Sequence, residues 1–220
     1  MSTERVIQSL VQDLRAVRRL PATGRRLSLW LAFAVPPIAL IVALMGVRND
    51  LWERLGEGLY LAEMLVMVAT GLIGGYGALA AGIPGTRRRT LLAPIVPLGA
   101  WIGLLAFQYG REWREVGATF WLDFHCIPAI AVISLVPIAT MVSLIRRGSP
   151  DRRAVAVLWG TLAAAALANV GLRLFHPVDS ALMVIAWQFG TVVVLTGLAT
   201  AARGHLVPNA PARTAGSTPA

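Results

Sequence analysis

Six long apolar blocks, separated by short polar segments, dominate the pattern of the chain. Each block has about the 20 residues that an α-helix needs to cross the hydrocarbon core of a bilayer. Backbone N–H and C=O groups must be satisfied within such a segment, which favours a helix. The sequence therefore predicts an all-α integral membrane protein with six transmembrane helices. The blocks are Leu27–Gly46, Leu59–Ile83, Leu91–Tyr109, Cys126–Ile145, Ala154–Phe175 and Ala181–Ala202.

Residues 1–20 show a different pattern, in which Ile7, Leu10, Leu14 and Val17 recur at spacings of three and four residues. This periodicity predicts an amphipathic helix. The segment lacks the continuous apolar core and the cleavage site of a signal peptide. We therefore expect a short helix that precedes the membrane spans and remains part of the chain.

Composition and breaker residues divide the chain into three parts. Pro21 and Gly24 are expected to end the amphipathic helix before the first span. Residues 1–24 are thus predicted to be a cytoplasmic amphipathic helix with its hinge, and residues 25–202 a six-helix transmembrane bundle. Residues 203–220 are rich in Pro, Ala, Ser and Thr, and are predicted to be a disordered cytoplasmic tail.

Composition supports a membrane protein, because 56% of the 220 residues are hydrophobic and only 14% are charged. The mean hydropathy is +0.67, whereas about a quarter of a soluble domain is charged. The net charge is +9, and all 20 basic residues are arginine. These arginines lie in clusters between the apolar blocks, so membrane topology explains them better than a nucleic-acid-binding face. No direct nucleic-acid contact is expected.

The distribution of arginine predicts the orientation of the spans. Fifteen arginines lie before the first span, in the second and fourth connections and in the tail, against five on the other side. Arginine and lysine are enriched on the cytoplasmic side of membrane proteins. Both termini are therefore predicted to be cytoplasmic, in the inner membrane of a bacterium. Trp30 is among the tryptophans expected near the membrane interfaces.

The sequence carries no recognisable catalytic motif, such as Gly-x-Ser-x-Gly, His-Glu-x-x-His, a P-loop or a dinucleotide fingerprint. No enzymatic activity is predicted. Transporters mark their paths with ionisable residues at membrane depth, and the spans hold few of these; Glu63 is expected near the outer interface. A small transporter and a structural or accessory membrane protein are the alternatives that composition leaves open.

The clearest chemical cluster lies on the predicted outer face. His125 and Cys126 open the fourth span, and His176 lies between the fifth and sixth spans. Thiolate and imidazole suit a soft metal ion such as zinc, cadmium or copper(I), and an exposed thiolate is also oxidisable. These residues are candidates for sensing or transient metal binding. The alternative is an interfacial thiol with two helix-end histidines that never meet.

The amphipathic N-terminal helix has two possible roles. It could lie on the anionic inner leaflet, or insert its apolar stripe into a groove of a cytoplasmic protein. Glu4 and Asp13 interrupt its positive charge, and it has no aromatic residue. These features favour a protein partner.

Three segments together resemble the NrsF family of negative regulators of sigma factors: ERVIQSLVQDLRAVRRLPATGRRLSLWLA, FHCIPA and LFHPVDSALMVIAWQ. The similarity runs from Glu4 to about Ala202, with matching span number and loop lengths. It implies a six-span anti-sigma factor of the inner membrane. Such a protein holds an extracytoplasmic-function sigma factor at the membrane and releases it under metal or oxidative stress.

The resemblance also implies roles for particular residues. Cys126 matches the first of two cysteines that the family uses for sensing, and His176 occupies the position of the second. Gln188 stands after Trp187, where the family has a histidine. A switch between two thiols of one subunit is therefore excluded here. The residues implied to bind the sigma factor are Leu10, Leu14, Arg15, Val17 and Arg18.

Overall fold

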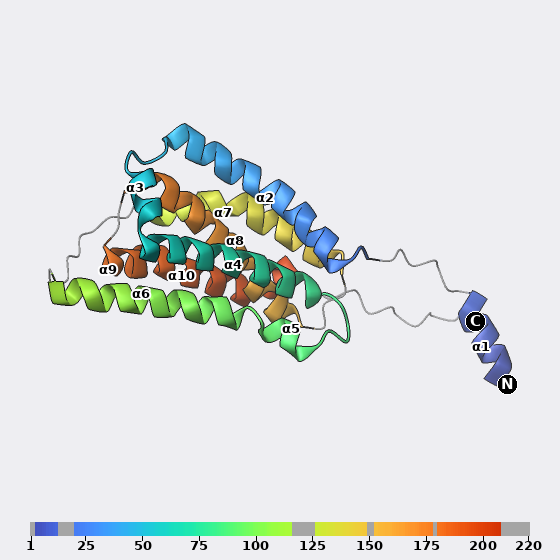
Figure 1. Cartoon of the computed structure of the whole chain (residues 1–220). Helices are drawn as coiled ribbons and strands as arrows, with labels where there is room; N and C mark the ends of the chain where they lie inside the picture. The colour runs from blue at the N-terminus through green and yellow to red at the C-terminus, as the bar shows by residue number, and fades with distance from the viewer. Residues whose placement is uncertain (1–2, 13–19, 116–125, 149–151, 178–179, 208–220) are drawn as a thin grey trace.

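The structure, a computed structural model, describes residues 3–12, 20–115, 126–148, 152–177 and 180–207. All regular structure within these residues is helical (Figure 1). Six helical segments are long and apolar enough to cross a membrane. The predicted fold class and the six predicted spans are therefore confirmed.

The helices fall into six long spans and several short elements. The first two spans are α2 (Thr23–Met45) and α4 (Gly58–Ala80), and the fourth and fifth are α7 (Cys126–Arg146) and α8 (Arg153–Phe175). The third span combines α5 (Arg88–Leu92) with α6 (Ile95–Glu115). The sixth combines α9 (Ala181–Met183), η1 (Val184–Phe189) and α10 (Gly190–Ala201). The other elements are α1 (Thr3–Gln12), α3 (Leu51–Gly56) and α11 (Arg203–Leu206).

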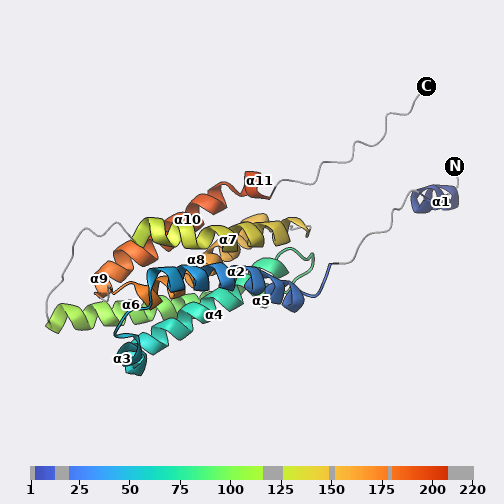
Figure 2. The ribbon, with the colours of Figure 1, turned by 90° about the horizontal axis from the view of Figure 1, so that it is seen from above.

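The spans pack side by side into one elongated bundle, as Figures 1 and 2 show. Both ends of the spanning region lie at the same end of this bundle. Arg26, in the first turn of α2, donates a hydrogen bond to Leu144 O at the end of α7. Arg146, also at the end of α7, donates to His205 O in α11. We call this the root end, because the N-terminal segment joins the bundle here. The opposite end, with α3, the last turn of α8 and α9, is called the loop end.

Helix α8 is the centre of the bundle. Over the most apolar 18 residues of this span, 83% of the residues are buried, whereas the corresponding share is 44% or less in the other five spans. Its sequence explains this position, because apolar and small residues occupy all sides of the helix and leave no polar face for an aqueous or interfacial surface. Residues Ala163–Ala166 are completely buried. Helices α2, α4, α7 and α10 all pack against it.

The contact between α4 and α8 is especially close. A Cβ atom added to Gly74 would lie 3.3 Å from Ala163 Cβ and 3.4 Å from Trp159 O. At Gly71 it would lie 2.7 Å from Cδ2 of Leu167. Lipid offers no hydrophobic force that drives helices together, so association depends on close packing of small residues. These glycines therefore determine how near the two helices come.

Two spans depart from regular α-helix. Pro94 separates α5 from α6, because proline lacks the N–H that would continue the helical hydrogen bonds. Trp159 Nε1 donates a hydrogen bond to Leu91 O at 2.9 Å and so holds α5 against α8. In the sixth span, η1 is a turn of π-helix that contains the fully buried Gln188.

Several local predictions differ from the structure. Gly24 lies inside α2, so Pro21 alone marks the break before the first span. The first connection contains α3, which was not predicted. The start of the predicted disordered tail forms α11, and Val207 after it is buried. The predicted N-terminal helix is described over Thr3–Gln12, and residues 13–19 and 208–220 lie outside the described residues.

The close approach of α4 and α8 generates a first prediction. We expect Gly74→Leu to lower the free energy of unfolding by about 1–3 kcal/mol, because the larger side chain forces the helices apart. Thermal unfolding of the purified protein in detergent measures this change. Gly103→Leu is the matched control, since no atom lies within 4 Å of a Cβ at that position. An equal loss of stability in both variants would contradict the proposed role of close packing.

Candidate functional site

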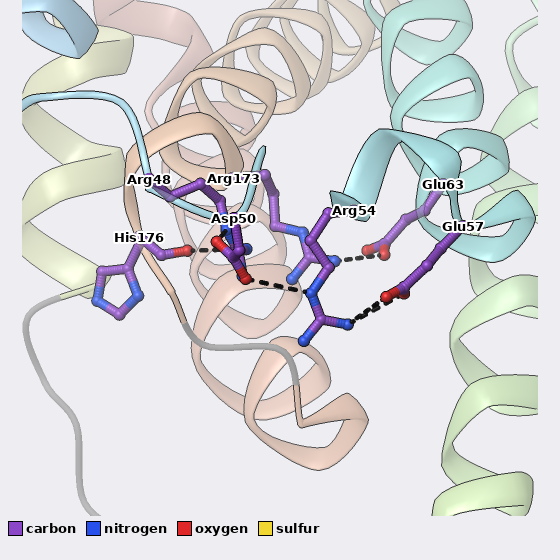
Figure 3. A network of polar contacts seen from close by, with 7 residues as sticks. All are labelled: Arg48, Asp50, Arg54, Glu57, Glu63, Arg173 and His176. Atoms are coloured by element: carbon purple, nitrogen blue, oxygen red, sulfur yellow. Dashed lines mark hydrogen bonds and ion pairs between the residues drawn. The ribbon is translucent and has the colours of Figure 1, made fainter. Parts of the chain in front are cut away.

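A network of arginines and carboxylates joins the connection after α2 to α3, α4 and the end of α8 at the loop end (Figure 3). Arg48 donates from Nε and Nη2 to the two carboxylate oxygens of Asp50, at 2.6 and 2.8 Å. Its Nη1 donates to His176 O at 3.4 Å, and its backbone N–H donates to Leu174 O at 3.0 Å. The last carbonyls of a helix have no partner within the helix. Arg48 therefore caps α8 and fixes the loop that follows α2.

The network continues from Asp50 into α3. Arg54 donates to Asp50 Oδ2 at 3.4 Å and to both oxygens of Glu57 at 3.0 Å. Hydrogen bonds from Arg48, together with its charge, hold the pKa of Asp50 well below its ordinary value. A lowered pKa in the folded state keeps the ion pair intact above the ordinary value of about 4. The Arg48–Asp50 ion pair weakens only as the pH falls towards the lowered pKa of Asp50, so this pair is insensitive to pH near neutrality.

A second ion pair is buried between α4 and α8. Arg173 Nη2 donates to Glu63 Oε2 at 3.0 Å, and the two side chains are 4% and 1% exposed. Tyr60 donates its hydroxyl proton to Arg173 O at 2.8 Å. The Arg173 guanidinium carbon lies 4.9 Å from the centre of the Tyr60 ring, within cation–π range. A buried charge requires a partner, so this pair ties α4 to the end of α8.

A cavity of about 570 Å³ with charged residues in its wall lies beside the buried pair, lined by residues of α3, α4, α6, α8 and α9. Its wall carries both signs of charge. Arg111 and Glu115 approach to 3.5 Å, and Ser180 donates to Glu112 Oε1 at 2.7 Å. Because these groups bind one another, the cavity has no evident preference for an anion or a cation.

Different contacts tie α2 to its neighbours at the root end. Arg26 is 3% exposed and donates to Leu79 O at 3.2 Å and to Leu144 O at 2.6 Å. These carbonyls belong to the last turns of α4 and α7, where a cation also meets the negative end of the helix dipole. About one helical turn further along α2, Trp30 Nε1 donates a hydrogen bond to Pro137 O of α7 at 2.9 Å. Trp30 is completely buried between the helices, and its expected position near a membrane interface stays a prediction.

The structure describes only part of the predicted sensing residues. Helix α7 ends at the root end, so its first residue, Cys126, lies at the loop end with His176. The His176 backbone takes part in the network, and Figure 3 shows its imidazole pointing away from the carboxylates. His125 and the Cys126 side chain lie outside the described residues. Among the described residues no three His, Cys, Asp or Glu side chains are placed to hold a metal. The soft-metal site stays a prediction.

The predicted sigma-binding residues are described even less completely. Leu10 belongs to α1, whereas Leu14, Arg15, Val17 and Arg18 lie outside the described residues. Their contacts with a partner stay a prediction.

Sequence reasoning missed the pairing of Glu63 with Arg173 and the buried position of Arg26. Glu63 and Arg173 are 110 residues apart in the chain. The sequence did contain a signal for the pair, because each residue is the lone charge within two turns of a span end. A charged side chain buried at such a position requires a partner of opposite charge. Arg26 gave no such signal, since it resembles every other arginine beside a span.

The fold and these contacts define a class: a multi-pass helical membrane protein whose charged side chains cap and connect its spans. The family model of negative regulators of sigma F (NrsF) matches residues 10–207, and the chain belongs to this family. Its partner is therefore a sigma factor, and it acts as an anti-sigma regulator. This regulatory role suggests that the protein is not an enzyme. Comparison with curated proteins and with solved structures gave no match.

The buried pair generates a second prediction. Glu63→Leu leaves Arg173 charged and buried without its carboxylate, and we expect this to reduce the free energy of unfolding by about 3 kcal/mol. Adding Arg173→Met should recover most of the loss, because replacing a whole buried ion pair by apolar groups is often neutral. Unfolding in detergent micelles measures both variants. A double variant that is less stable than Glu63→Leu alone would contradict this account.

Proposed function

We propose that this chain binds an extracytoplasmic-function sigma factor through its N-terminal helix at the cytoplasmic face of a bacterial inner membrane. It releases this factor when a metal or oxidative signal acts at the loop end. The observation that carries the proposal is the match to the negative regulators of sigma F over residues 10–207. This match begins inside α1 and includes the whole bundle.

The surface of α1 supports the assignment of a protein partner. Ile7 and Val11 belong to the apolar stripe of this helix, and they are 49% and 58% exposed. An amphipathic helix with an exposed apolar stripe suits insertion into a hydrophobic groove of another protein. The sigma factor bound in this way is kept from RNA polymerase.

The charge of the root end supports its cytoplasmic location. The arginine clusters at residues 25–26, 87–89, 146–147 and 152–153 all flank span ends at this side of the bundle. Clusters of arginine beside spans are characteristic of the cytoplasmic side. The N-terminal helix would then meet the sigma factor in the cytoplasm, and Cys126 and His176 would face the opposite compartment.

The sensing step is proposed at Cys126, the only cysteine of the chain. Binding of a soft metal, or oxidation of the thiol, favours an arrangement of the spans in which the sigma factor binds less tightly. A ligand shifts such an equilibrium only by its different affinities for the two states. A 100-fold loss of sigma affinity requires a coupling free energy of about 3 kcal/mol.

Co-purification from membranes tests the partner and its binding helix. We expect a sigma factor to be recovered with the tagged full chain and lost when residues 1–20 are deleted, as identified by mass spectrometry. The pair Leu10→Asp and Leu14→Asp should reduce recovery at least tenfold, because it places charge on the apolar stripe. Gln8→Asp with Gln12→Asp adds the same charge off that stripe and is the control. Equal recovery with and without residues 1–20 would contradict binding by this segment.

Release in stressed cells tests the sensing step. We expect Cys126→Ala to hold the sigma factor normally in unstressed cells but to reduce its release by cadmium or peroxide at least tenfold, measured with a sigma-dependent reporter. His176→Ala should weaken the cadmium response more than the peroxide response if the imidazole is a metal ligand. Normal stress-induced release by Cys126→Ala would rule out sensing at this thiol.

A further inference from the structure

Two cavities share a wall at the root end, beside α5, α8 and α10, and each has a volume of about 270 Å³. The wall of the first is mostly polar and includes the turn between α4 and α5. The wall of the second is almost entirely apolar and includes Leu92, Leu158 and Trp159. Leu91 and Arg152 line both. A polar compartment thus adjoins an apolar groove at the end of the spans.

Specific contacts build these walls. The hydrogen bond from Trp159 Nε1 to Leu91 O holds α5 in place above α8. Thr86 donates its hydroxyl proton to the carbonyl oxygens of Ala80 and Ile83, at 2.7 and 2.8 Å. Gly85 has a φ of 78°, a backbone conformation that suits glycine and gives the turn its shape. The compartment is therefore part of the fold and does not depend on exposed side chains alone.

Arginine side chains lie at both cavities. Arg152 lines both cavities and Arg88 lines the apolar groove. Both side chains are exposed, and neither forms an ion pair with a carboxylate of the described residues. Arg152 is also the N-cap residue of α8. The first amides of a helix lack partners within the helix, and they meet the positive end of its dipole. An anionic group in the polar compartment would meet the Arg152 guanidinium and the N-terminus of α8, with Arg88 at the adjoining groove.

One further polar group lies in the apolar groove. Thr200 of α10 lines it, and its hydroxyl oxygen is buried with no hydrogen-bond partner among the described residues. A buried hydroxyl without a partner is costly. A ligand that brings an ester or phosphate oxygen into the groove would satisfy it.

From these observations we infer that the paired cavities bind one anionic phospholipid. Its phosphate lies in the polar compartment beside Arg152, next to the groove that Arg88 lines, and one acyl chain follows this apolar groove past Leu158. The ester region comes near Thr200. Basic pockets between spans that adjoin an apolar surface are suited to anionic lipid headgroups. The bilayer is the source of this ligand, because a free phosphate would leave the groove unfilled.

Native mass spectrometry of the purified full chain tests the site. The protein is equilibrated in detergent with equal amounts of phosphatidylglycerol and phosphatidylcholine that carry the same acyl chains. We expect one retained phosphatidylglycerol, with a preference over phosphatidylcholine on the order of 30-fold from two arginines. Arg88→Gln with Arg152→Gln should remove nearly all of this preference. Arg89→Gln with Arg147→Gln removes the same charge from the same end outside the cavities and should leave the preference unchanged.

A second variant tests the groove without changing its charge. Ala154 is exposed and lines the apolar groove, so Ala154→Trp should fill it and reduce phosphatidylglycerol retention at least tenfold. Three outcomes would overturn the inference. These are equal retention of the two lipids by the unaltered chain, equal losses in the two arginine double variants, and full retention by Ala154→Trp. The second of these would indicate diffuse attraction to a basic surface.

Discussion

The close packing of α4 on α8 is the contact on which the rest of the bundle depends. In lipid the apolar surface of a helix gains little from leaving its surroundings, so spans associate where their backbones can approach closely. Gly71 and Gly74 provide that approach to Ala163 and Leu167. With α8 held in this way, α7, α10 and α2 have a surface of small residues around which to pack. The central position of α8 follows from its composition.

A tightly packed core of helices leaves the carbonyl groups at helix ends to be satisfied by other groups. In this protein arginine side chains do so at both ends of the bundle. Arg48 caps α8 at the loop end, and Arg26 caps α4 and α7 at the root end. Arginine therefore has two functions here, since its clusters favour one membrane orientation and individual members connect the spans. A count of arginines along the sequence detects the first function and not the second.

The sequence was sufficient to predict the spans, because the length and hydropathy that make a helix stable in a bilayer are local properties. It was insufficient where a residue's environment depends on a distant part of the chain. Trp30 lies near a span end in the sequence, and only the packing of α2 on α7 buries it and brings its Nε1 to Pro137 O. Glu63 and Arg173 become partners only after α4 and α8 pack. The π-helical turn η1 likewise has no signature in the hydropathy pattern, since α- and π-helical turns require the same apolar residues.

The position of α7 accounts for how a bundle of this kind could connect its two ends. This helix begins at Cys126 at the loop end, and its carbonyls at Pro137 and Leu144 accept hydrogen bonds from α2. Helix α2 begins at Thr23 at the root end, directly after the N-terminal segment in the sequence. A signal that displaces α7 along its axis must therefore either move α2 with it or break two buried hydrogen bonds, and leaving buried groups unpaired costs roughly 1–3 kcal/mol for each. That cost is comparable to the coupling free energy that a 100-fold change in sigma affinity requires. Under the proposed function, the attachment of α2 to α7 would therefore carry a displacement from the loop end to the root end of the bundle.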